Sequence, residues 1–202
     1  MWISELSDRS GVPLATIKYY LREGLLPPGE QVSATRARYD ESHVRQLRLV
    51  RALVGIGGLS IARVRAVLEA VADDSLTMHD VLGAAHGALV PSAGLVSDES
   101  RARVVRLLRQ RKWHVHGKSP DQNLLAAALD AIDRVGHPID DRLLSVYAGA
   151  ADSVAAAEVA GLDAKDRASA VEQAVVFTAL GGPVLLALRR LAQQSASAQR
   201  YG

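Results

Sequence analysis

The sequence predicts a mostly α-helical protein in two parts, residues 1–72 and residues 73–202. Two observations lead to this fold class. Apolar residues, chiefly alanine, leucine and valine, recur at the spacing of an amphipathic helix. Outside the 30s, no run alternates between apolar and polar residues for long enough to indicate a strand. A chain of 202 residues, 49% of them hydrophobic, can bury the core of one large domain or two small ones.

The N-terminal end predicts a short helix, a tight turn and a second helix. The short helix covers residues 4–9, with Ile3 and Leu6 facing inward, and the stretch SGVP turns the chain. Pro13 suits the first turn of the second helix, and Gly24 supplies the left-handed residue that ends it.

The next elements complete a small N-terminal domain. Residues 25–39 predict a loop or a small β-hairpin, because prolines and a glycine precede a polar stretch that ends in TRARY. Asp40 can cap a third helix, which GIGG ends, and Ser60 can cap a fourth.

The second part is predicted to be entirely helical after a linker, DDSLT. The stretch SPDQ has a serine, a proline and a glutamine placed for a capping box, and GGP separates the last two helices. The predicted helices cover residues 78–89, 98–113, 120–136, 141–160, 164–180 and 183–196.

The second helix carries two adjacent tyrosines among cations. At about 100° per residue, Leu14, Ile17 and Leu21 share the inward side, and Lys18 and Tyr20 lie at the margins between the two sides. We expect both tyrosines and Lys18 to point outward. Tyrosine hydroxyls and cationic side chains can contact phosphate oxygens, so this helix can enter the major groove of DNA. The alternative is that both tyrosines are partly buried and the cations are merely solvated. The outward side consists of Ala15, Thr16, Tyr19 and Arg22.

Composition and charge narrow the possible functions. Cysteine is absent, which excludes disulfides, thiolate metal sites and cysteine nucleophiles. No apolar run is expected to span a membrane and no signal peptide is evident, so we expect a cytoplasmic protein. The net charge is only +2, but residues 31–65 are strongly basic, as expected where one part of a chain faces a polyanion. Their seven arginines are Arg36, Arg38, Arg45, Arg48, Arg51, Arg63 and Arg65.

Two long stretches, ISELSDRSGVPLATIKYYLREGLLPP and RYDESHVRQLRLVRALVGIGGLSIARVRAVL, resemble the N-terminal domain of the MerR family of bacterial transcription regulators. The resemblance implies a winged helix-turn-helix that places a recognition helix in the major groove, with two copies on a pseudo-palindrome. By position it implies DNA contacts from Ala15, Thr16, Lys18, Tyr19, Tyr20, Arg22, Arg36, Arg38, Tyr39 and Arg63.

The chain departs from the family pattern in three places. Pro13 occupies the position where the family usually has a serine or threonine cap. The wing reads TRARY where the family commonly has Gly-Tyr-Arg-x-Tyr. The stretch GALVPSAGLV at residues 87–96 interrupts the long helix through which many members dimerise, so that device is missing or shortened.

A dimer is still expected, because one short recognition helix buries too little surface for tight specific binding. The candidate interface is residues 169–192, which are rich in alanine, valine and leucine; the alternative is that they form the core of a monomeric domain. Trp113, Tyr147 and Phe177 are candidates for lining an apolar ligand pocket, although scattered aromatics are usually ordinary core.

Other patterns indicate a function less clearly. His114 and His116, or His79 and His86, lack the grouped ligands that a metal site needs, so we expect no metal and no cofactor. The run RARVVRLLRQRK at residues 101–112 can be a second nucleic-acid patch, but an amphipathic helix with solvated arginines fits it better.

The sequence therefore predicts a dimeric DNA-binding transcription regulator rather than an enzyme. Its expected partners are double-stranded DNA, a second copy of itself, RNA polymerase indirectly, and a small apolar ligand, with no membrane. An excisionase-like protein that bends DNA is the main alternative. The second alternative is an enzyme, but the sequence contains neither a phosphate-binding glycine loop nor a nucleophile with a base near it.

Overall fold

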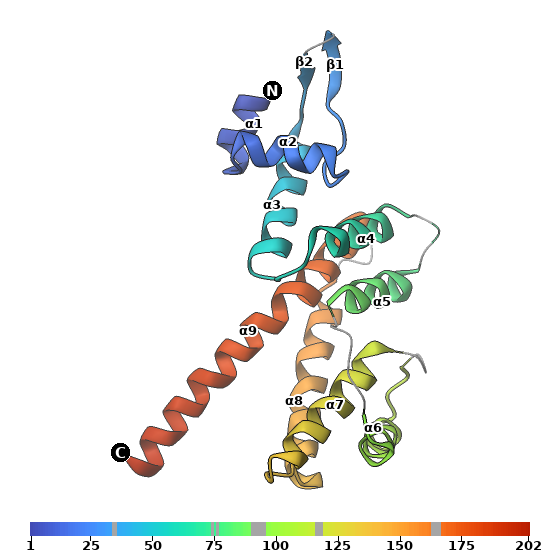
Figure 1. Ribbon diagram of the computed structural model, residues 1–202, viewed down its shortest axis with the longest axis vertical. Helices are drawn as coiled ribbons and strands as arrows, with labels where there is room; N and C mark the ends of the chain where they lie inside the picture. The colour runs from blue at the N-terminus through green and yellow to red at the C-terminus, as the bar shows by residue number, and fades with distance from the viewer. Residues whose placement is uncertain (34–35, 74, 76, 90–95, 116–118, 163–166) are drawn as a thin grey trace. The chain divides into compact units, whose positions relative to one another are not determined.

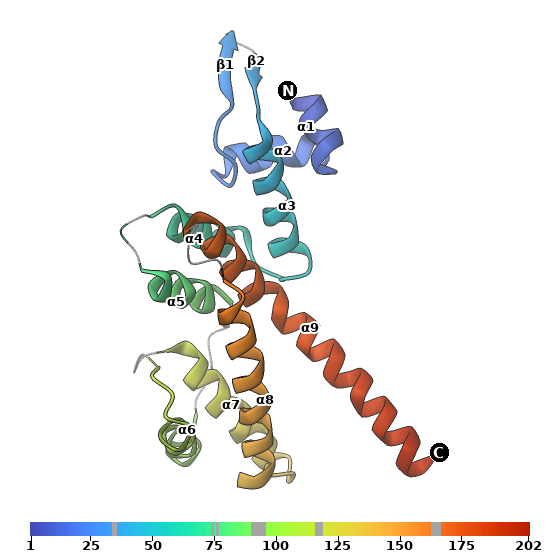
Figure 2. The same ribbon diagram turned by 180° about the vertical axis from the view of Figure 1, so that it is seen from behind.

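The computed structural model describes the chain except for residues 34–35, 74, 76, 90–95, 116–118 and 163–166 (Figures 1 and 2). The described residues are mostly helical, which confirms the predicted fold class. By internal contacts the chain forms two compact units. One consists of Met1–Thr77 with Val175–Gly202, and the other of Met78–Ala174. The division into domains at residue 72 stays a prediction.

The N-terminal unit begins with the predicted pair of helices, α1 (Ile3–Ser10) and α2 (Leu14–Arg22). Gly11 adopts a left-handed conformation at the end of α1, with φ of 67°, and its N–H donates to the Ser7 carbonyl. Pro13 lies at the N-cap of α2 without a side-chain cap. Leu6 and Ile17 are fully buried, so these helices pack through the predicted faces. Leu14 is 37% exposed, and the prediction that it faces inward is wrong because it lies at the open first turn of α2.

A small antiparallel hairpin follows, of strands β1 (Glu30–Ser33) and β2 (Arg36–Arg38). In Figure 1 the hairpin projects away from the helices, with the chain's N-terminus beside it. Glu30 pairs with Arg38 and Gln31 with Ala37. The residues are largely exposed, so the hairpin depends on its base for support.

Helices α3 (Glu41–Gly55) and α4 (Ile61–Ala72) complete this part of the unit. Both predicted caps are confirmed: Asp40 accepts from the N–H groups of Ser42 and His43, and Ser60 accepts from that of Arg63. Each cap satisfies N–H groups that the first turn of a helix leaves unpaired. The buried side chains of α3 and α4 include Val44, Leu47, Val50, Leu53, Val64 and Val67.

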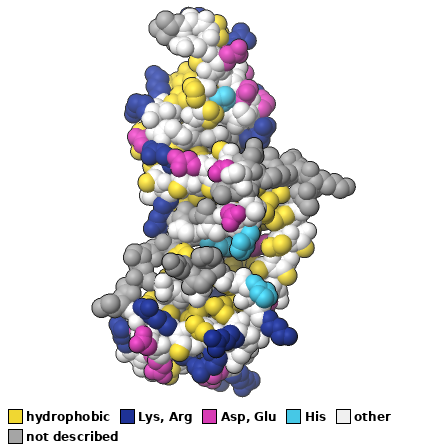
Figure 3. Space-filling model, turned by 90° about the vertical axis from the view of Figure 1, so that its right-hand side faces the viewer, with side chains coloured by type: hydrophobic (Ala, Val, Ile, Leu, Met, Phe, Trp, Pro, Cys, Tyr) yellow, Lys and Arg dark blue, Asp and Glu magenta, His cyan; other side chains and the backbone are white. Residues whose placement is uncertain are grey.

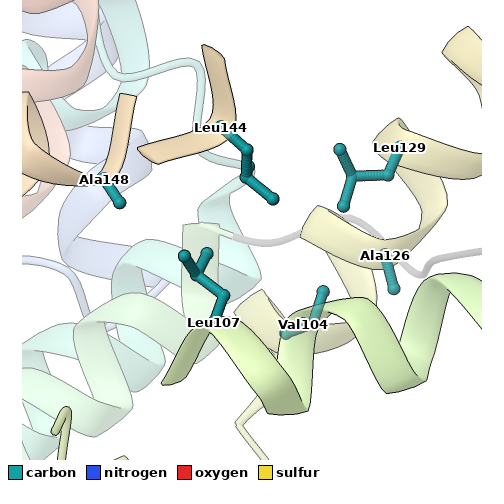
Figure 4. Close-up of a cluster of buried hydrophobic side chains, with 6 residues drawn as sticks. All are labelled: Val104, Leu107, Ala126, Leu129, Leu144 and Ala148. Atoms are coloured by element: carbon teal, nitrogen blue, oxygen red, sulfur yellow. The ribbon is translucent and has the colours of Figure 1, made fainter. Parts of the chain in front are cut away.

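The other unit contains α5 (Met78–Leu89), α6 (Asp98–Arg111), α7 (Pro120–Arg134) and α8 (Asp141–Ala160). Polar contacts join α6 to its neighbours. Ser100 of α6 donates to Asp130 of α7, and Arg111 of α6 forms an ion pair with Asp152 of α8 at 3.4 Å. Ser119 makes no side-chain cap bond, so the capping box predicted from SPDQ is wrong. Three of these helices share an apolar core of Val104, Leu107, Ala126, Leu129, Leu144 and Ala148 (Figure 4).

The last helix, α9, runs without a break from Arg167 to Tyr201. The prediction of two helices separated by GGP is therefore wrong. A proline ring clashes chiefly with the Cβ of the preceding residue and with the carbonyl one turn back. Gly182 has no Cβ, so the first of these two clashes is absent at Pro183, which lies inside the helix.

Two expectations need qualification. By length and composition alone, Asp141–Ala160 and Ser169–Tyr201 are apolar enough to cross a membrane, with mean hydropathies of 1.2 and 1.7, contrary to the expectation that no stretch is. One or two such helices are weak evidence of a membrane span. The interruption expected at residues 87–96 falls largely on residues 90–95, which lie outside the described residues.

Candidate nucleic-acid interface

The exposed face of α2 carries most of the side chains that the sequence placed there. Ala15, Lys18, Tyr19 and Arg22 are exposed, and Thr16 is half-buried. The guanidinium of Arg22 lies 5.9 Å from the centroid of the Tyr19 ring, close enough for a cation–π contact. This face presents two cations, a phenol and small side chains, a combination suited to phosphates and base edges.

Tyr20 does not belong to that face. Its side chain is only 6% exposed, so the expectation that both tyrosines face outward is wrong for this one. Successive helical residues differ by about 100° in direction, and Tyr19 already occupies the outward position. The two rings lie 6.0 Å apart. Burial is the main cause that raises the pKa of Tyr20, followed by the neighbouring Tyr19, so Tyr20 is a neutral phenol that supports the exposed ring.

The wing supplies two further exposed cations, Arg36 and Arg38, on alternate positions of β2. Tyr39, which follows them, is only 8% exposed, so it is not placed for the DNA contact that the family resemblance implies. Its ring packs edge-on against His43 with centroids 5.1 Å apart, and burial raises its pKa. Tyr39 therefore anchors the wing to the start of α3.

Gly29 allows the wing to close at its base. A Cβ at this position would lie 2.5 Å from the Arg38 carbonyl oxygen and 2.9 Å from the Tyr39 ring. Real Cβ atoms are not found so near a backbone oxygen, so only glycine fits here.

Three of the arginines in the basic segment donate hydrogen bonds to backbone carbonyls at the ends of helices. Arg48 donates to the Arg9 carbonyl and Arg51 to the Gly11 carbonyl, both at the end of α1. Arg65 donates from Nε to the Glu23 carbonyl at 2.9 Å and forms a 2.8 Å ion pair with the Glu23 carboxylate. Cations at helix C-termini complement unpaired carbonyls and the helix dipole.

Basic and acidic side chains are mixed on one face of the protein (Figure 3). On the face drawn in Figure 3, lysine and arginine side chains are interspersed with acidic ones and do not merge into one basic patch. Arg63 lies in the first turn of α4, half-buried, with its N–H on the cap oxygen of Ser60. Its location at a helix N-terminus is compatible with the predicted backbone contact.

The residues predicted to line a ligand pocket belong to different units, Trp113 and Tyr147 to one and Phe177 to the other. Trp113 is half-buried, donates from its indole to Asp152, and lines a groove of about 500 Å³ with Val105 and Leu108. Tyr147 and Phe177 do not line this groove and are 39% and 37% exposed. His116 lies outside the described residues, and the described ones contain no group of three or more potential metal-ligating side chains.

Trp2 is a further residue of this surface that was not predicted from the sequence. Its ring lies 5.9 Å from the Arg36 guanidinium and 5.2 Å from that of Arg38. It also lines a groove of about 1000 Å³, together with Lys18 of α2 and Gln31 of β1. Trp2 and the two wing arginines are more than 30 positions apart in the chain, so no local pattern in the sequence connects them.

Comparisons with known proteins agree with this arrangement. The profile of the MerR helix-turn-helix family of regulatory proteins matches residues 1–71. The crystal structure of SCO5550 from Streptomyces coelicolor A3(2), described as a candidate transcriptional regulator, is similar over 100% of this chain and 98% of its own, with 42% identity and a TM-score of 0.76. The transcription regulator PbrR691 from Ralstonia metallidurans CH34, solved with lead(II), matches 62% of this chain and 99% of its own at 21% identity; its TM-score of 0.39 is too low to support an argument. No curated protein matches this chain.

Proposed function

The chain belongs to the MerR family of helix-turn-helix transcription regulators, and we propose that it acts as a dimer that binds a pseudo-palindromic operator. The observation that carries this proposal is the outward face of α2, where Lys18, Tyr19 and Arg22 are all exposed. Two exposed wing arginines, Arg36 and Arg38, extend the cationic surface. A major groove accepts one helix, and flanking cations can contact the phosphates beside it.

Individual roles follow from side-chain chemistry and exposure. Lys18, Arg36 and Arg38 are placed to contact phosphates, and Ala15 and Thr16 leave room for a close approach to base edges. Tyr19 can contact either. The buried Tyr20 and Tyr39 support this surface rather than touch bases.

We assign the dimer interface to the C-terminal half of α9, where all residues from Val184 onward are exposed. Val184, Leu188 and Leu191 are 58%, 58% and 61% exposed and lie on one side of the helix. Isolated apolar residues on a surface are ordinary, but a continuous stripe along a long exposed helix marks an interaction site. The opposite side carries Arg190 and Gln193.

The stripe is complementary to itself in one antiparallel register. Its members, spaced alternately by four and three residues, are Phe177, Gly181, Val184, Leu188, Leu191 and Ser195. If a two-fold axis passes level with Leu186, Val184 meets Leu188 of the second copy. Gly181 then faces Leu191, and Phe177 faces Ser195. In two of these three pairs a large side chain faces a small one, which favours close knobs-into-holes packing.

The second unit is the proposed place for control by a small ligand. The groove beside Trp113 combines Val105 and Leu108 with the cations Arg109 and Lys112, so an amphiphilic anion would fit its lining better than a purely apolar molecule. Ligand binding would act on RNA polymerase only indirectly, through the bound promoter.

We place the protein in the cytoplasm with its DNA, and propose no enzymatic activity. An excisionase-like architectural role remains the alternative.

The experiment is to map genomic occupancy and then measure binding of a recovered duplex by fluorescence anisotropy. Tyr19→Ala should weaken operator binding without lowering the melting temperature. Arg38→Ala should weaken binding to all duplexes and reduce the salt slope by about 0.9 for each phosphate that the variant no longer neutralises. Arg106→Ala removes an exposed arginine of α6 and is the matched control. It should change neither the affinity for duplex DNA nor the salt slope. A wild-type chain that ignores duplex DNA at low salt would overturn the proposal, and a footprint on recombination sites instead of promoters would favour the architectural alternative.

A further inference from the structure

The first residue of the chain is bonded to the base of the wing. The amino group of Met1 donates to the Tyr39 carbonyl at 2.7 Å, and the Tyr39 N–H donates back to the Met1 carbonyl at 2.9 Å. Two residues that exchange both bonds in this way form the hydrogen-bonded pair of an antiparallel ladder. The N-terminus therefore extends the hairpin just beyond the end of β2, and it places Trp2 beside the wing.

Trp2 contacts both arginines of β2. Arg36 and Arg38 are two residues apart in a strand, so their side chains leave the same face. The guanidinium carbons lie 5.9 and 5.2 Å from the centroid of the indole ring. Tryptophan is the best aromatic partner for a cation, and the contact requires the cation within about 6 Å of the ring.

The contact orients the arginines without neutralising them. In the described part of the chain, no carboxylate lies within ion-pair distance of Arg36 or Arg38, in contrast to Arg65, which pairs with Glu23. An aromatic ring leaves the positive charge and the N–H donors of a guanidinium available to a phosphate. Trp2 is itself 39% exposed, so the stacked side chains remain accessible from solvent.

Trp2 also connects the wing to the recognition helix. The groove that it lines is bordered by Arg36 from β2 and by Lys18 from α2. Side chains from both elements of the candidate interface therefore border one surface, with the indole between the chain terminus and the wing. A loss of the indole would release two long side chains and open one wall of this groove.

We propose that Trp2 is a positioning residue of the nucleic-acid interface, which holds Arg36 and Arg38 in the orientation that contacts DNA phosphates. This inference rests on the proposed DNA-binding function. Long side chains lose rotamer freedom when they bind, and side chains that are already ordered lose less. The indole thus raises affinity without touching DNA itself.

The test compares Trp2→Ala, Trp2→Phe, Arg38→Ala and the double variant Trp2→Ala/Arg38→Ala in the full chain. Anisotropy with a recovered duplex is measured between about 50 and 200 mM salt, where phosphate contacts dominate the salt dependence. Trp2→Ala should weaken binding about three- to tenfold and make the salt slope shallower. Trp2→Phe should restore most of the affinity because it keeps an aromatic face.

The double variant separates positioning from general stability. If Trp2 acts through Arg38, the second substitution should cost much less in the Trp2→Ala background than alone. Additive losses, or an unchanged salt slope with Trp2→Ala, would overturn the inference.

A spectroscopic measurement covers the case in which Trp2→Ala does not fold. Arg38→Ala should alter the tryptophan emission of the free protein, since Trp113, the other tryptophan, is the same in both chains. Identical emission would count against the stacking. If the wild-type chain binds no duplex, the proposed function fails; if it binds and the Trp2 variants match it, only this inference fails.

Discussion

Replacing Leu188 with alanine should weaken dimerisation strongly, whereas replacing Leu186 should not. The two leucines lie on the same exposed helix and differ by two positions, or about 200° around its axis. Leu188 belongs to the proposed interface stripe, and Leu186 faces the side that carries Arg190 and Gln193. They are similarly exposed, at 58% and 49%, so each serves as the control for the other.

The expected magnitude follows from the exposed area that a partner would cover. A leucine-to-alanine change removes three carbon groups, each contributing about 0.8 kcal/mol when fully buried. Because Leu188 is 58% exposed, association can bury roughly that share, which corresponds to about 1.4 kcal/mol per helix. A two-fold interface contains the residue twice. The loss is then about 2.8 kcal/mol, or roughly a hundredfold in the dimer dissociation constant.

Sedimentation velocity over a dilution series of the full chain measures this constant directly. Leu188→Ala should shift the monomer–dimer midpoint to about a hundredfold higher concentration, and Leu186→Ala should match the wild type. Thermal melts check that both variants remain folded. Equal effects of the two substitutions, or a wild-type chain that stays monomeric, would refute the assignment of this face.

Three further predictions concern folding. Gly29→Ala should destabilise the wing and weaken DNA binding, because its Cβ would meet a carbonyl oxygen at 2.5 Å. Gly83→Ala should instead stabilise the exposed part of α5 by about 0.5 to 1 kcal/mol, because nothing lies within 4 Å of its Cβ. Urea unfolding measures the change in stability of both variants, and changes of the same sign would contradict the reasoning. Ser60→Ala should lower the free energy of unfolding by about 1 kcal/mol through loss of the α4 cap, and an unchanged urea midpoint would show that the cap contributes nothing. A hydrogen bond from Ser97 and the charge of Arg134 hold the pKa of Asp130 below its usual 3.8, so its stabilisation is fully present above pH 3.8 and is lost as pH falls through the lower folded value. Asp130→Asn should therefore reduce stability at neutral pH and flatten this acid dependence in urea titrations; an unchanged dependence would exclude Asp130 as its source.

Local rules predicted most of the helices and the outward face of α2, because caps and apolar spacing act within a few residues. Asp40 and Ser60 were recognisable as caps for this reason. The burial of Tyr20 could not be predicted in this way, because a residue at the margin of a helix face is buried or exposed according to what packs beside it. Residues 25–39 are compatible with either a loop or a small hairpin, because no turn signature in the sequence distinguishes the two.

The remaining errors have physical causes as well. GGP suggested a break in α9, but Gly182 has no Cβ, which removes one of the two clashes that a proline makes inside a helix. Residues 169–192 were predicted as the dimer interface from their composition, but the antiparallel register was not, because Gly181 and Ser195 interrupt the apolar pattern of the stripe. Trp2 was missed because its contacts join residues more than 30 positions apart, which no local pattern reveals.

The two uses of arginine in the N-terminal unit limit how strongly DNA binding should depend on salt. Arg48, Arg51 and Arg65 already donate to backbone carbonyls at the ends of α1 and α2. If only Lys18, Arg22, Arg36, Arg38 and Arg63 contact phosphates, a dimer neutralises ten of them, and the slope of log K against log salt should be about −9. Were the three carbonyl-bound arginines also engaged, the slope would approach −14. Anisotropy titrations of one operator duplex at several salt concentrations distinguish these values. A slope near −14 would mean that Arg48, Arg51 and Arg65 leave their carbonyls when DNA binds. The distinction between arginines that bond to helix ends and arginines that contact DNA would then be wrong.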